Sequence, residues 1–423
     1  MDIFDKIGDL SFIEAYKSSG LYPYFRELEK NQGTVVEYQG QKLIMLGSNN
    51  YLGLAQDARV IEAAVAATKA WGSGCTGSRV LNGNLSLHEA LETALAEFLN
   101  TQSALVFSCG FTTNLGAISA LCGPEDVILS DKENHASILE GCRVSRAKLI
   151  SYRNCDLEHL EQQLNKLPLE QAKLIITDGV FSMSGQIAPL KEITQLAQRF
   201  NARTYVDDAH GLGVIGEGGR GTASHHNALA DITMGTFSKT LGSQGGFIAG
   251  ERQMIEYLRH SSRTLIFSAA TSPSNAAAAL KALEIVRQEP ERIETLHRNA
   301  QYLKNGLKHM GLNTLGTETS IVPVLVADDQ KAFILCKRLL ELGVFTTPVI
   351  FPATARGKAL IRCSVTSAHS LDQLDQCLEA FQQVALQIIA ANDSPNKTIL
   401  TDLLKSNSSK AHSINPSLLK ELS

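Results

Sequence analysis

A lysine with neighbouring hydroxyl groups lies near the middle of the chain. Lys239 is part of Gly-Thr-Phe-Ser-Lys-Thr-Leu-Gly (235–242), and Val-Asp-Asp-Ala-His (206–210) precedes it. Pyridoxal phosphate (PLP) needs such groups: an amine forms a Schiff base with its aldehyde, hydroxyls and backbone N–H groups bind its phosphate, and a carboxylate keeps its ring nitrogen protonated. The spacing therefore predicts an enzyme that uses PLP for carbanion chemistry.

Asp207 and His210 follow an apolar run and lie three residues apart, so both can reach one cofactor from a single loop. Asp207 would pair with the pyridine nitrogen and His210 with the phenolic oxygen. Taken singly, Lys239 is more typical of a surface turn, and the adjacent acids Asp207 and Asp208 of a solvated turn. Their combination favours the catalytic interpretation, with Asp208 in a structural role.

Two further segments follow predicted strands. His135 could stack on the ring of PLP and limit which bond breaks, although a lone histidine is more often structural. Gly110 and Phe111 open a predicted helix, whose free N–H groups can bind an anion. Together with the hydroxyls of Thr236 and Ser238, this helix start predicts a phosphate site.

Arg362 lies inside a predicted half-buried strand, Leu-Ile-Arg-Cys-Ser. A buried arginine needs an anion, and an α-amino acid supplies a carboxylate suited to bidentate pairing. An internal ion pair is an equally good interpretation of the sequence alone.

The elements that must position these groups form an α/β domain. Seven short apolar runs alternate with helical segments, which predicts a mostly parallel sheet that binds ligands beyond the carboxyl ends of its strands. The runs are Ala104–Phe107, Val127–Leu129, Leu149–Tyr152, Leu174–Thr177, Thr204–Val206, Ile232–Gly235 and Gly246–Ala249.

The 423 residues are enough for two hydrophobic cores. We expect an N-terminal arm over 1–55, a large PLP-binding domain over 56–290 and a smaller α+β domain over 291–392. One long helical stretch from about Ser274 to Leu307 would join the two domains. Residues 393–423 are rich in Asn, Ser, Lys and Pro, which predicts a mobile polar tail.

Composition excludes several other classes of function. The formal net charge is −4, so the totals indicate no basic surface for nucleic acid. The eight cysteines show no C-x-x-C pair, which favours reduced thiols in the cytoplasm over a disulfide framework or a metal site. The sequence predicts no signal peptide and no membrane span, and it leaves peripheral membrane contact open.

With these residues laid out, the chain resembles the α-oxoamine synthases from about Tyr22 to Leu378. The likeness rests on many ordered motifs besides those around Asp207, Lys239 and Arg362. They are Leu-Gly-Ser-Asn-Asn-Tyr-Leu-Gly-Leu (46–54), Gly-Ser-Gly-Cys-Thr-Gly-Ser-Arg (72–79), Leu-Asn-Gly-Asn (81–84), Leu-His-Glu (87–89), Asn-His-Ala-Ser-Ile (134–138) and Asp-Gly-Val-Phe-Ser-Met-Ser-Gly (178–185).

The resemblance implies a fold-type I, aspartate aminotransferase-like transferase and a role for each matching residue. Lys239 would hold PLP covalently, Asp207 its ring nitrogen, His135 its ring face and His210 its oxygen. Arg362 would take the substrate carboxylate. The remaining implied contacts are Gly110, Phe111, Thr236 and Ser238 to the phosphate, Ser182 beside the cofactor, and Asn50 and Ser268 reaching the site of a partner subunit in a homodimer.

The resemblance also implies the reaction. These enzymes join an amino acid to the acyl group of an acyl-CoA or an acyl carrier protein thioester, with loss of carbon dioxide. Phe237 and Ser238 in the lysine motif, and Phe-Pro-Ala-Thr (351–354), are similar to the branch that uses L-serine and a long-chain acyl group. The alternative is the alanine-using branch or another synthase of a specialised pathway. Two alternatives of other classes remain. One is an aminotransferase or lyase that uses no acyl donor, and the other is a non-catalytic subunit of a heterodimer.

Overall fold

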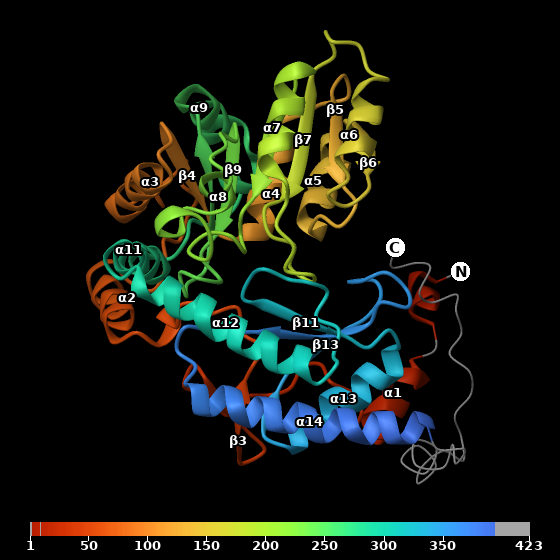
Figure 1. Ribbon diagram of the computed structural model, residues 1–423. Helices are drawn as coiled ribbons and strands as arrows, with labels where there is room; N and C mark the ends of the chain where they lie inside the picture. Colours follow the sequence, from red (N-terminus) through yellow and green to blue (C-terminus); the bar gives the residue numbers. More distant parts are fainter. Residues whose placement is uncertain (1, 9, 394–423) are drawn as a thin grey trace.

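A computed structural model describes residues 2–8 and 10–393. Its largest feature is one seven-stranded sheet in the order β4-β10-β9-β8-β7-β5-β6 (Figure 1). All seven predicted strands are confirmed, and all lie in this sheet. Their bounds are β4 Ser103–Phe107, β5 Val127–Asp131, β6 Lys148–Tyr152, β7 Lys173–Asp178, β8 Arg203–Asp207, β9 Ile232–Thr236 and β10 Gly246–Gly250.

The sheet is mostly parallel, as predicted. Strands β6, β5, β7, β8 and β9 run parallel, whereas β10 is antiparallel to both of its neighbours, β9 and β4. The carboxyl ends of β4, β5, β7, β8 and β9 therefore share one edge of the sheet. At this edge Asp178 of β7 lies opposite Asp207 of β8 in register.

Helices cover both faces of this sheet. Side chains alternate along each strand, so that in β4 Leu105 contributes to one buried apolar cluster and Val106 to another. The helical elements of this part of the chain are α2 Ala58–Trp71, α3 Ser86–Leu99, α4 Gly110–Leu121, α5 Ala136–Ser145, α6 Leu157–Leu164, α7 Leu190–Arg199, η3 Glu217–Gly219, α8 Thr222–His225, α9 Arg252–Ser261, α10 Arg263–Ile266 and α11 Pro273–Gln288.

A second, smaller body lies in the lower half of Figure 1 and combines the two ends of the described chain. Strand β3 pairs in parallel with the short strand β12, which brings the N-terminal segment into this body. Ile44 and Leu46 pack in the same apolar cluster as Ile361 and Phe381. The elements are η1 Ile3–Ile7, α1 Ser11–Ser18, β1 Lys30–Asn31, β2 Val35–Tyr38, β3 Gln41–Met45, η2 Leu54–Gln56, α12 Glu291–His309, β11 Ile321–Leu325, α13 Asp329–Glu341, β12 Val344–Phe345, β13 Thr347–Val349, β14 Leu360–Ser364 and α14 Leu371–Asp393.

The prediction of one long helical stretch from Ser274 to Leu307 is wrong in one respect, because two separate helices lie there. Helix α11 ends at Gln288, and α12 begins after Pro290. A proline disfavours helical backbone at the residue before it, and Glu289 has a non-helical ψ of 63°.

The predicted polar tail, apart from Asp393 at the end of α14, lies outside the described residues. Within residues 2–8 and 10–393, the helices include none with the length and apolar character needed to cross a membrane.

Candidate active site

The predicted site residues converge where the carboxyl edge of the large sheet faces β14. Asp207 ends β8, Lys239 follows β9 and His135 precedes α5. The charges of Asp207 and Lys239 both act on the pKa of His135, and those of Lys239 and Arg362 both act on the pKa of His210. The structure thus brings all five residues into one electrostatic cluster.

Asp207 is a buried carboxylate held in a fixed orientation. Its Oδ2 accepts a hydrogen bond of 2.7 Å from Asn114 Nδ2, and its Oδ1 accepts one of 3.1 Å from the backbone N–H of Ala209. Asn114 is itself fixed, because its Oδ1 accepts a 2.7 Å bond from the hydroxyl of Tyr205. A buried, oriented acid of this kind can keep the ring nitrogen of PLP protonated.

Lys239 lies near enough to this acid to feel its charge, in an environment that perturbs its amine. Burial lowers the pKa of Lys239, and the charges of Asp207 and Asp178 counteract part of that effect. A lysine with a lowered pKa has more neutral amine near neutral pH, which favours both imine formation and proton abstraction.

His210 is buried and contacts a second buried ring. Its Nδ1 lies 2.7 Å from the hydroxyl of Tyr51. Burial lowers the pKa of His210 well below its usual range, and the positive charges of Lys239 and Arg362 act in the same direction. His210 is therefore neutral at physiological pH.

Arg362 is buried in β14, where its hydrogen bonds go to neutral oxygen atoms. Its Nε donates to the carbonyl oxygen of Ser182 at 2.5 Å, its Nη1 to Ser364 Oγ at 2.6 Å and its Nη2 to the hydroxyl of Tyr51 at 3.3 Å. No carboxylate of the described residues forms an ion pair with it. The alternative of an internal ion pair is thus wrong within this part of the chain, and the charge is left for an anionic ligand.

His135 lies at the rim of the cluster. It is the N-cap of α5, where its Nδ1 lies 2.7 Å from Ser137 Oγ and accepts from the backbone N–H of Ser137 at 3.3 Å. Desolvation by surrounding protein atoms lowers the pKa of His135, although part of its surface stays exposed. Its exposed part leaves a ring available to stack on a bound cofactor.

The predicted phosphate residues also lie together. Helix α4 begins at Gly110, and a Cβ added there would lie 2.9 Å from Thr236 Oγ1. Thr236 Oγ1 is 2.9 Å from Ser238 Oγ, and the side chain of Phe111 is exposed. Free N–H groups at a helix start beside a pair of hydroxyls fit a phosphate group.

Two predicted residues are not brought into this cluster. Asn50 is held in its own loop, where its Nδ2 donates to Gln56 Oε1 at 2.8 Å and its Oδ1 accepts from the backbone N–H of Ala55 at 3.2 Å. Ser268 follows α10, beside the exposed Phe267. Their expected contacts belong to a partner subunit and stay predictions.

The sequence did not assign roles to three residues that shape the site. Tyr51 and Asp178 lie inside motifs that carried the resemblance, and Asn114 lies one helical turn after Gly110. That spacing places Asn114 and Gly110 on one face of α4, a signal that could have identified Asn114. Burial and the charge of Asp207 raise the pKa of Asp178 well above its usual range, and Lys239 acts in the opposite direction.

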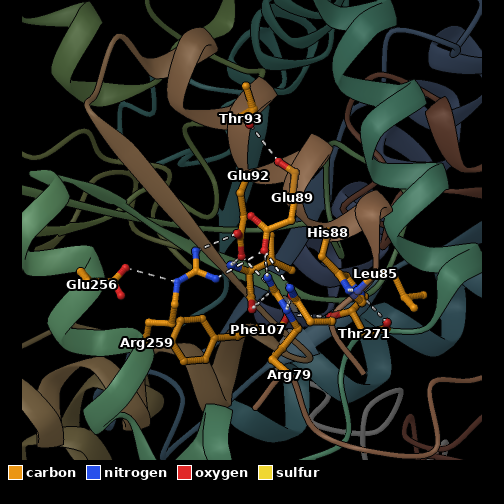
Figure 2. A network of polar contacts seen from close by, with 12 residues as sticks. Arg79, Leu85, His88, Glu89, Glu92, Thr93, Phe107, Glu256, Arg259 and Thr271 are labelled. Carbon is orange, nitrogen blue, oxygen red and sulfur yellow. Dashed lines mark hydrogen bonds and ion pairs between the residues drawn. The ribbon is translucent and has the colours of Figure 1, made fainter. Parts of the chain in front are cut away.

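The loop between α2 and α3 is held by a buried ion-pair network, and Figure 2 shows its members pointing toward one another. Glu92 Oε1 accepts from Arg79 Nη1 at 2.7 Å and from the backbone N–H of Val106 at 2.8 Å, while its Oε2 lies 3.1 Å from Arg259 Nη2. His88 Nε2 lies 2.8 Å from the carbonyl oxygen of Thr271. Arg79 of motif 72–79 and His88 of motif 87–89 thus help to hold the loop and the start of α3 against β4 and Thr271.

Substitution of Glu92 by glutamine should destabilise the protein, because it leaves the buried guanidinium of Arg79 without its closest counter-charge. The expected loss is about 3 kcal/mol. Thermal unfolding of the purified protein measures it. Glu256→Gln is the matched control, since Glu256 is exposed and lies 3.7 Å from Arg259, so its loss should cost about 0–1 kcal/mol. Equal effects of the two substitutions would contradict a supporting role for the network.

Comparison with known proteins agrees with this geometry. Residues 41–381 match the family model described as aminotransferase class I and II. A serine palmitoyltransferase of Sphingobacterium spiritivorum is 45% identical over 385 residues, which cover 90% of this chain and 96% of that relative. An 8-amino-7-oxononanoate synthase of Symbiobacterium thermophilum is also 45% identical, over 379 residues that cover 89% of this chain and 97% of the relative.

Solved structures show the same likeness. A structure described as SPT with PLP internal aldimine superimposes with a TM-score of 0.88 at 36% identity, and the match covers 92% of this chain and 99% of the other. The arrangement of amine, acid, helix start and hydroxyls described above fits the same cofactor, PLP.

Proposed function

The chain belongs to the α-oxoamine synthases, within the class I and II aminotransferases, and is a PLP-dependent enzyme of the acyltransferase type; from this premise we propose that it acts as a serine palmitoyltransferase. It would condense L-serine with a long-chain acyl thioester such as palmitoyl-CoA. The products are carbon dioxide, the free thiol and an α-aminoketone, 3-ketodihydrosphingosine for a palmitoyl group. This reaction would be a first step of sphingolipid synthesis.

The observation that carries this proposal is the buried guanidinium of Arg362. Its hydrogen-bond partners among residues 2–8 and 10–393 are one carbonyl oxygen and two hydroxyl oxygens, all of them neutral. An amino-acid carboxylate would supply the missing negative charge with bidentate geometry. A carboxylate held there would lie near Lys239, since the charge of Arg362 also acts on the pKa of the Lys239 amine.

The side chains divide the chemistry among them. PLP, when bound, supplies an electron sink for the α-carbon. Lys239 would remove the α-proton and later return one, with an amine whose pKa burial has lowered. Asp207 would keep the ring nitrogen protonated, and His210 would donate to the phenolic oxygen. Gly110, Phe111, Thr236 and Ser238 would hold the phosphate, as the sequence predicted.

The choice of serine rests on the serine-like lysine motif and on the Sphingobacterium relative. Phe237 of that motif is fully buried and stacks on Phe247 with ring centroids 5.9 Å apart, so it contributes packing. The second candidate is an alanine-using 8-amino-7-oxononanoate synthase, which the equally identical Symbiobacterium relative favours.

A substrate comparison tests this choice. The purified enzyme is assayed with L-serine, L-alanine and glycine against acyl-CoA thioesters of increasing chain length. We expect the highest kcat/KM with L-serine and a long chain. A higher kcat/KM with L-alanine at every chain length would favour the second candidate.

We further propose a homodimer whose site is completed by the partner subunit. Two large apolar side chains are strongly exposed: Leu81 is 80% and Phe267 is 74% exposed. Ser268 adjoins Phe267, and Leu81 lies in the loop that the Arg79 network supports. Burying this surface against a second copy would remove it from water.

Leu81→Asp should weaken this dimer at least about 100-fold, because it places a charge in an apolar contact. Light scattering during size-exclusion chromatography measures the dimer fraction across a dilution series, and specific activity should fall with it. Leu229→Asp provides the control. Leu229 is 88% exposed and lies just before the amino end of β9, whereas the candidate site lies at the carboxyl ends of the strands. An unchanged dimer in Leu81→Asp would contradict this interface.

We place the enzyme in the cytoplasm. All eight cysteines are free, and five of them are buried. Free thiols are typical of a reducing compartment, which supports this assignment.

A further inference from the structure

Tyr51 connects His210 and Arg362, two parts of the site that the sequence analysis considered separately. The residue is completely buried, and its hydroxyl lies 2.7 Å from His210 Nδ1 and 3.3 Å from Arg362 Nη2. Its carbonyl oxygen accepts from the backbone N–H of Ser367 at 2.8 Å, which fixes the loop that carries it. A single hydroxyl therefore bridges the carboxylate-binding arginine and the histidine beside the cofactor.

The direction of each hydrogen bond follows from the available protons. A guanidinium has only donors, so Arg362 must donate to the tyrosine oxygen. The tyrosine has one proton and two nearby acceptors, His210 Nδ1 at 2.7 Å and Asn49 Oδ1 at 3.3 Å. Because O–H donors normally bond at 2.5–3.0 Å, the proton goes to His210 Nδ1.

That direction sets the tautomer of a neutral histidine. A ring whose Nδ1 accepts must carry its proton on Nε2, and burial together with the charges of Lys239, Arg362 and His135 keeps this ring neutral. The reverse tautomer would place two protons between Nδ1 and the tyrosine oxygen, unless the tyrosine proton turned to the more distant Asn49.

We infer that Tyr51 is a positioning residue that holds His210 as its Nε2–H tautomer and links that ring to Arg362. The inference rests on the proposed function for its consequence. With its proton on Nε2, His210 could donate to the phenolic oxygen of PLP when PLP is bound. A carboxylate bound at Arg362 would change the strength of the hydrogen bonds that run from Arg362 through Tyr51 to His210. Binding of the substrate and polarisation of the cofactor are then coupled through one hydroxyl.

The tautomer can be measured without cofactor or substrate. The apoenzyme is labelled with ¹⁵N and ¹³C in histidine, and its ring signals are recorded by NMR, with His210 assigned by difference from His210→Asn. We expect wild-type His210 to carry its proton on Nε2 and Tyr51→Phe to show both tautomers. Tyr257→Phe is the control, since it removes a hydroxyl that donates to the carbonyl oxygen of Ala120, and it should leave the His210 signals unchanged.

A wild-type spectrum with the proton on Nδ1 would overturn the inference, and so would an unchanged tautomer in Tyr51→Phe. The wild-type spectrum tests the tautomer of His210 even if the Tyr51→Phe protein does not fold. In the holoenzyme, Tyr51→Phe should lower kcat about tenfold with little change in the KM for the amino acid. A raised KM with unchanged kcat would instead assign Tyr51 to substrate binding alone. Because the NMR experiment uses no substrate, its failure is distinguishable from failure of the proposed function.

Discussion

Replacement of Lys239 by alanine should lower kcat for L-serine and palmitoyl-CoA at least about 1,000-fold, because it would remove both the proposed covalent attachment point of PLP and the proposed base for the α-proton. Steady-state assays of thiol release measure the loss. Borohydride reduction followed by mass spectrometry of the digested protein should find PLP attached to the peptide that contains Lys239 in the wild type only.

The control for this change is Lys281→Ala, which removes a partly exposed lysine paired with Glu284 on α11. It should retain wild-type turnover and the same labelled peptide. Ordinary turnover by Lys239→Ala loaded with PLP would contradict the assignment of the amine.

Replacement of Arg362 by methionine should lower kcat/KM for the amino acid at least about 100-fold, because losing one partner of a buried charged pair costs about 3 kcal/mol. The loss should appear mainly as a raised KM for the amino acid. Arg362→Lys should recover part of the affinity, since it restores the charge without the bidentate fork. Assays at varied L-serine and saturating palmitoyl-CoA separate the two constants.

Arg338→Met is the matched control, since Arg338 is partly exposed and pairs with Glu341 on α13. It should leave both constants unchanged. PLP absorbance should persist in Arg362→Met, because none of the predicted cofactor contacts is removed. An unaltered KM in that variant would exclude Arg362 as the carboxylate site.

The strands could be predicted because parallel strands buried on both faces read as apolar runs. All six residues of β7 are buried, and its central apolar run, Leu174–Thr177, was predicted from the sequence. The pairing of β3 with β12 could not be predicted, since β12 has only two residues, Val344 and Phe345, and lies about 300 residues away in sequence. So short a strand carries no periodicity, and only tertiary packing defines it.

Within the site, Lys239 and Asp207 were predictable because each follows a strand in a recognisable motif. The contact of Asn114 with Asp207 and that of Tyr51 with His210 join segments 93 and 159 residues apart, and no local pattern records them. The sequence alone could not decide whether Arg362 forms an internal ion pair or binds a ligand carboxylate. That depends on which acidic side chains the fold brings near the arginine.

The central claim is that this chain releases carbon dioxide from an amino acid only as it forms a carbon–carbon bond with an acyl group. Purified holoenzyme is incubated with carboxyl-labelled L-serine, with and without palmitoyl-CoA, and labelled carbon dioxide and free thiol are counted. We predict equal amounts of the two products with the thioester and no labelled carbon dioxide without it. Release of carbon dioxide from serine alone, or thiol release without carbon dioxide, would contradict the account.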